Sequence, residues 1–74
     1  MPLNLLNLRV ELENRVRART GRQIRNLDVQ LLPEGVVLRG EVMSFYIKQL
    51  AQQGVREFLP DIQLDNAIQV AVAS

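Results

Sequence analysis

The chain has 74 residues, enough for one small domain with a thin hydrophobic core. It contains neither Cys nor His, which excludes disulfides, thiolate chemistry and the commonest metal ligand and general base. The net charge is +1, but residues 1–25 carry six Arg against two Glu, whereas residues 26–74 carry three basic against six acidic residues.

The first predicted element is a helix over residues 4–20. One of its faces is apolar at a spacing of three or four residues and consists of Leu5, Leu8, Leu12 and Val16. Asn4 is a suitable N-cap, and Gly21 suits the left-handed position that follows many helices.

Two other features of this segment are candidates for binding. A second, shorter apolar stripe, formed by Leu3, Leu6 and Val10, either packs against an edge or loop or is a candidate contact for a partner or membrane. The arginines either balance helix electrostatics and aid solubility, or form a basic surface for anionic lipid or nucleic acid. That candidate basic surface consists of Arg9, Arg15, Arg17, Arg19, Arg22 and Arg25.

A hairpin is predicted next, from strands at residues 24–32 and 36–42. Both strands alternate apolar and polar residues, and matching their apolar sides requires Leu31 to pair with Val36 and Val29 with Leu38. This pairing needs an even number of loop residues within the segment Pro33-Glu34-Gly35. A type I turn with Pro33 in its second position, a turn centred on Glu34-Gly35, or a bulge would each satisfy it.

The second predicted helix covers residues 45–59, with Ser44 as its cap and Pro60 at its end. Gly54 lies within its apolar stripe, and Gly40 lies in the inward series of the preceding strand. Two glycines on facing surfaces predict a close approach between this helix and the sheet.

The last predicted element is a strand over residues 62–73, whose apolar side is interrupted by Asn66. A buried Asn must be hydrogen-bonded. Asn66 is therefore expected to hold backbone at a bulge or strand end, with a ligand contact as the alternative.

The predicted order is α-β-β-α-β, so the chain is expected to be one α+β domain spanning residues 1–74. Each strand has one apolar side, which predicts two helices packed on one face of a three-stranded mixed sheet. The second helix would cross over between two parallel strands.

This order resembles the BON domain, a bacterial module named for osmotic-stress and nodulation proteins. The resemblance rests on an apolar-x-Leu-x-Gly-x-Val pattern at residues 36–42 and an apolar-x-Asn-x-apolar-x-Val pattern at residues 64–70, and it covers residues 8–72. The associated structural positions are Gly35, Leu38, Gly40, Gly54 and Asn66. The resemblance implies an adaptor without catalytic activity or cofactor, often linked to phospholipid or the cell envelope.

This chain differs from many members of that family in two ways. It carries one copy where tandem copies are common, and its start lacks the pattern of an export signal. A cytoplasmic location is therefore expected if the chain is complete; otherwise it is an excised domain. No apolar run exceeds the four residues 70–73, so no transmembrane helix is predicted.

Two functions rank equally on the sequence: binding to an anionic lipid surface, and protein interaction or self-association through open strand edges. Nucleic-acid binding ranks below them, because neither a Gly-x-x-Gly loop between helices nor an aromatic pair on the sheet is present. An enzyme is the least favoured reading, since no nucleophile and base are paired. Metal and cofactor sites are not expected.

Overall fold

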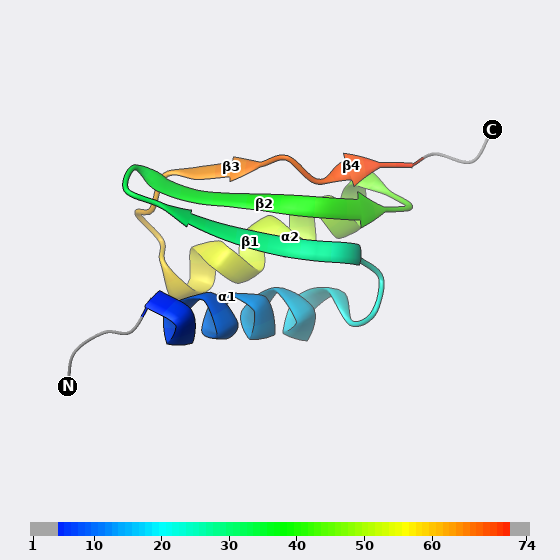
Figure 1. Cartoon of the computed structure of the whole chain (residues 1–74). Helices are drawn as coiled ribbons and strands as arrows, with labels where there is room; N and C mark the ends of the chain where they lie inside the picture. Colours follow the sequence, from blue (N-terminus) through cyan, green and yellow to red (C-terminus); the bar gives the residue numbers. More distant parts are fainter. Residues whose placement is uncertain (1–4, 72–74) are drawn as a thin grey trace.

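The computed structural model describes the backbone of residues 5–71 and the side chains of residues 7–71 (Figure 1). In chain order, its elements are α1 (Leu5–Thr20), β1 (Arg25–Leu32), β2 (Gly35–Val42), α2 (Phe45–Phe58), β3 (Leu64–Asn66) and β4 (Gln69–Val70). The order α-β-β-α-β and the α+β class are therefore confirmed. Asn4, the expected cap of α1, lies outside the described residues.

The ends of both helices follow from local chemistry. Gly21 has a φ of 62° and its N–H donates to Arg17 O at 2.7 Å, which ends α1 in the expected left-handed conformation. Ser44 begins α2, where its hydroxyl oxygen accepts a hydrogen bond from Ile47 N at 3.3 Å.

The hairpin has the predicted register. β1 runs antiparallel to β2, and Val29 lies opposite Leu38 while Leu31 lies opposite Val36. Leu32 pairs with Gly35, so the loop contains only Pro33 and Glu34, in agreement with a turn that has Pro33 in its second position. The alternative turn centred on Glu34-Gly35 is thereby excluded.

β1 contains a bulge at the end remote from this turn. Its register against β2 shifts by one residue between Arg25 and Asp28, and Asn26 has a φ of 55°. Gly40 lies opposite this bulge, where an added Cβ would come within 2.8 Å of Ile24 Cγ2 and 3.0 Å of Arg25 O.

The expected continuous strand over residues 62–73 is wrong. It forms the two short strands β3 and β4, both parallel to β2, separated at Ala67 and Ile68. The register against β2 is unchanged across the break, so no residue is inserted. Asn66 lies at the interruption, where its side-chain oxygen accepts from Ile68 N at 3.3 Å and its amide donates to Lys48 O at 3.0 Å. Residues 72 and 73 lie outside the described part.

Both helices cover the same face of the sheet, as predicted (Figure 1). The buried core is formed jointly by the helices and the inward side of the strands. It consists of Leu12, Val16, Val29, Val36, Leu38, Val42, Ile47, Ala51, Val55 and Ile68.

The predicted close approach of Gly54 to the sheet is wrong. A Cβ at Gly54 would lie 2.8 Å from Arg15 O and 3.1 Å from Val16 Cα, both in α1. Gly54 therefore permits close contact between the two helices. The periodicity of α2 placed Gly54 correctly on the buried face, but it could not distinguish a neighbouring helix from the sheet.

Candidate functional site

Four of the six arginines in the predicted basic surface are paired with acids. Arg9 lies 3.3 Å from Glu13 and 3.1 Å from Asp28. Arg15 lies 3.0 Å from Glu11, and its guanidinium carbon lies 5.0 Å from the centre of the Phe58 ring.

The other two paired arginines also lie on α1. Arg17 is 3.8 Å from Glu13, and Arg19 pairs with Glu57 of α2. These ion pairs reduce the positive potential along α1. The proposed contact through the six arginines stays a prediction, and four of them share their charge with acidic partners.

Arg22 and Arg25 differ from these four. Both are exposed, and among residues 7–71 neither has a carboxylate within 4 Å. They lie in and just after the connection from α1 to β1, which is at the same end of the molecule as the connection from β2 to α2 (Figure 1). Two positive charges are thus available at this end.

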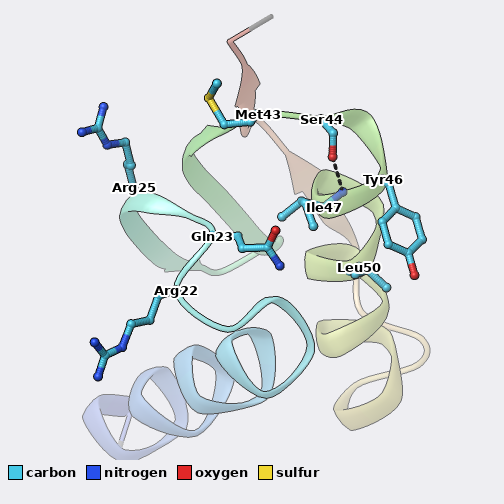
Figure 2. A pocket seen from close by; sticks show the side chains of 8 residues that line it. All are labelled: Arg22, Gln23, Arg25, Met43, Ser44, Tyr46, Ile47 and Leu50. Carbon is cyan, nitrogen blue, oxygen red and sulfur yellow. Dashed lines mark hydrogen bonds between the residues drawn. The ribbon is translucent and has the colours of Figure 1, made fainter.

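A groove with a volume of about 660 Å³ lies at this end, between the α1–β1 connection and the first turns of α2. Its lining includes Arg22, Gln23, Arg25, Met43, Tyr46 and Leu50. Figure 2 shows Gln23 directed towards Ile47, whereas the side chains of Arg22 and Arg25 extend away from the groove on its other side. The arginine head groups are consequently free to meet an approaching surface.

Three large apolar side chains are exposed at this end of the molecule, and two of them, Met43 and Tyr46, line the groove. Met43 is 66% exposed, Phe45 71% and Tyr46 67%. We call these three residues the α2 tip. With Ile47 and Ala51 facing the core, the helical rotation of 100° per residue directs Phe45 outwards. Single exposed apolar residues are ordinary, but three large ones within residues 43–46, at one end of the molecule, are a departure from that pattern.

Sequence reasoning missed the α2 tip. The signal was available, because Phe45 and Tyr46 fall outside the apolar stripe of α2 and directly follow its cap. Large aromatic residues on the polar side of a short amphipathic helix are a departure from the usual pattern.

The second apolar stripe is described only at Val10, which is 46% exposed. Leu3 and the side chain of Leu6 lie outside the described residues. The proposed contact through these three residues therefore stays a prediction.

The positions that carry the BON resemblance are packing positions in this structure. Leu38 is fully buried, and a Cβ at Gly35 would collide with the carbonyl oxygen of Gln63. Asn66 connects Lys48 of α2 with Ile68 beyond β3. They explain the fold but present no binding chemistry of their own.

Within the described part of the chain, no three His, Cys, Asp or Glu side chains gather so as to hold a metal ion. No helix there has the length and apolar character needed to cross a membrane. Comparisons with protein-family models, curated proteins and solved structures found no match for this chain.

Proposed function

We propose that this chain is a non-catalytic binding module that binds anionic phospholipid surfaces through the α2 tip, Arg22 and Arg25. The observation that carries the proposal is that three exposed apolar side chains lie at the same end of the molecule as two arginines that have no acidic partner among residues 7–71. The combination matches the two forces that hold peripheral proteins on membranes, namely burial of apolar side chains and attraction to anionic lipid.

The apolar part of this attraction comes from Met43, Phe45 and Tyr46. Aromatic side chains are favoured at the boundary between headgroups and hydrocarbon, and the Tyr hydroxyl can stay hydrated there. Complete burial of a Phe or Met side chain is worth about 1.5–3 kcal/mol, and partial insertion is worth less. Insertion of the α2 tip alone therefore predicts weak and reversible binding.

The electrostatic part comes from Arg22 and Arg25. A basic residue close to an anionic membrane contributes about 1 kcal/mol, and this contribution decreases as salt rises. The paired arginines of α1 contribute less, because their acidic partners offset their charge. In this proposal the basic contact surface lies at the end of the molecule and does not extend along α1.

The BON resemblance supports the same class of function. It rests on the element order and on motifs at residues 36–42 and 64–70, and it implies a module often linked to phospholipid. Those motif positions pack the core and cannot themselves contact lipid. The resemblance therefore suggests the class of partner, and the exposed residues suggest which surface binds it.

Co-sedimentation with phosphatidylserine/phosphatidylcholine vesicles at low salt tests the proposal. We expect the protein to bind these vesicles, to lose binding as salt rises, and to bind pure phosphatidylcholine poorly. Phe45→Ser together with Tyr46→Ser should greatly reduce binding. Leu32→Ser is the matched control, because Leu32 is also exposed but lies at the opposite end of the sheet.

A second comparison separates the contribution of Arg22 and Arg25 from that of the paired arginines on α1. Arg22→Gln with Arg25→Gln should weaken binding by more than tenfold. Arg17→Gln, which removes an arginine already close to Glu13, should have a smaller effect per charge. Absence of binding to anionic vesicles at low salt would refute the proposal. Unchanged binding by the Phe45 and Tyr46 variant would show that the α2 tip serves another partner, such as a protein.

A further inference from the structure

β1 forms one free edge of the sheet. β2 is central, with β1 on one side and β3 and β4 on the other. The opposite edge is interrupted at Ala67 and Ile68, whereas β1 is eight residues long and is interrupted only by the bulge near its start. β1 is therefore the better template for addition of a further strand.

The hydrogen bonds of β2 show which backbone groups of β1 face outwards. Val36 N donates to Gln63 O, and the carbonyl oxygens of Leu38 and Val42 accept from Ala67 N and Ala71 N. The backbone N–H and C=O groups of even-numbered residues in β2 therefore point towards β3 and β4. The backbone groups of odd-numbered residues in β2 must then point towards β1, where their hydrogen-bonding partners are Leu32, Gln30 and Asp28.

The intervening residues Val29 and Leu31 consequently direct their backbone N–H and C=O groups towards the free edge. Residues 29–32 contain no ionisable side chain, and Asp28, at the end of this stretch, pairs with Arg9 of α1 at 3.1 Å. Natural edges are commonly protected by lysines or inward-pointing charges, and residues 29–32 have neither.

We propose that two copies of this chain associate by antiparallel pairing of their β1 edges, with the two-fold axis passing between the two Gln30 residues. In this register Val29 of each copy pairs with Leu31 of the other, which forms four backbone hydrogen bonds and one sheet that continues through both copies.

The bulge at one end of β1 and Pro33 beyond its other end exclude the neighbouring registers. A two-fold axis at Val29 would place Leu31 opposite Leu27, within the bulge. An axis at Leu31 would place Val29 opposite Pro33, which has no N–H to donate. The axis at Gln30 avoids both ends.

Side chains are compatible with this pairing. Val29 and Leu31 meet on the side that faces the helices, where both already pack in the core of their own copy. On the other side Gln30 meets Gln30, and Asp28 meets Leu32, which is 42% exposed in the single chain. No like charges lie opposite each other, and an exposed Leu is covered. The geometry thus favours a second copy over an unrelated peptide.

A charge exchange at the two-fold axis tests this arrangement. Gln30 is exposed, so Gln30→Glu and Gln30→Lys should both fold, as circular dichroism would verify. Each variant alone places like-charged side chains on two residues whose Cα atoms lie about 4.5 Å apart across the axis, which should raise the dimer Kd about tenfold. A mixture of the two variants should restore association, measured by sedimentation equilibrium. Gln69→Lys, an exposed change on β4 opposite Glu41, is the control and should leave association unchanged.

A wild-type protein that remains monomeric at high concentration would overturn the proposal. A dimer that both Gln30 variants leave intact would overturn it equally, because its interface would lie elsewhere. Neither result bears on lipid binding, which is measured separately with vesicles.

Discussion

Gly54 allows the backbone of α2 to lie directly against that of α1. Gly54→Ala would favour the helix by about 1 kcal/mol, but the added Cβ would press on Arg15 O and Val16 Cα. Backbone atoms cannot rotate away, so the helices must separate, and overpacking of this kind costs about 1–3 kcal/mol. We expect a net loss of unfolding free energy in urea titration. Gln53→Ala, an exposed change in the same helix, should be neutral or slightly stabilising, and equal stability of both variants would contradict this account.

Asn66 uses both halves of its amide, which makes its substitutions informative. Asn66→Asp keeps an acceptor for Ile68 N but loses the donor to Lys48 O and places a negative charge near that carbonyl. We expect a loss of about 1–3 kcal/mol in unfolding free energy at pH 7, measured by urea titration. Asn66→Ala should cost less than Asn66→Asp. The opposite order would mean that the bond to Ile68 is the more important one.

Residue-level predictions succeeded where neighbours in the sequence decide the outcome. The left-handed Gly21 and the cap at Ser44 follow from local chemistry. The pairs of Arg15 with Glu11 and Arg17 with Glu13 have a spacing of four residues and could have been anticipated. The pairing of Arg19 with Glu57 could not, because 38 residues separate them and only the packing of α1 on α2 brings them together.

At the scale of elements, the register of the hairpin was predictable because cross-strand partners must share a face. This requirement predicted that Leu31 pairs with Val36, without knowledge of the turn type. The break between β3 and β4 was not predictable from alternation, which continues through it. A polar residue in an apolar series indicated that Asn66 needed partners, but the partner Lys48 lies on another element.

Ser44 both begins α2 and lies beside the α2 tip, so its substitutions separate stability from binding. Ser44→Ala removes the cap and should cost about 1 kcal/mol in unfolding free energy, with little direct effect on lipid binding. Ser44→Asp keeps a capping oxygen and should retain stability, but its negative charge should weaken binding to anionic vesicles severalfold. Urea titration and vesicle co-sedimentation measure the two effects. Stronger binding by Ser44→Asp would argue against an anionic partner.

At the scale of the whole molecule, the α2 tip and the β1–β2 turn lie at opposite ends of the sheet (Figure 1). Antiparallel pairing about Gln30 reverses one copy relative to the other. The two α2 tips of the proposed dimer would therefore lie at opposite ends of the shared sheet, where they cannot meet the same flat membrane. The two proposals together predict a bridge between two surfaces.

Vesicle tethering tests that combination. We expect the wild-type protein to cluster anionic vesicles, seen as increased light scattering, because each dimer presents one α2 tip to each of two vesicles. Gln30→Glu should still co-sediment with vesicles but should cluster them poorly, since it weakens pairing without altering the tip. Phe45→Ser together with Tyr46→Ser should greatly reduce both properties. If Gln30→Glu clusters vesicles as well as the wild type does, then clustering arises without the β1 pair. If vesicle binding and dimerisation both occur without clustering, the antiparallel placement of the tips is wrong.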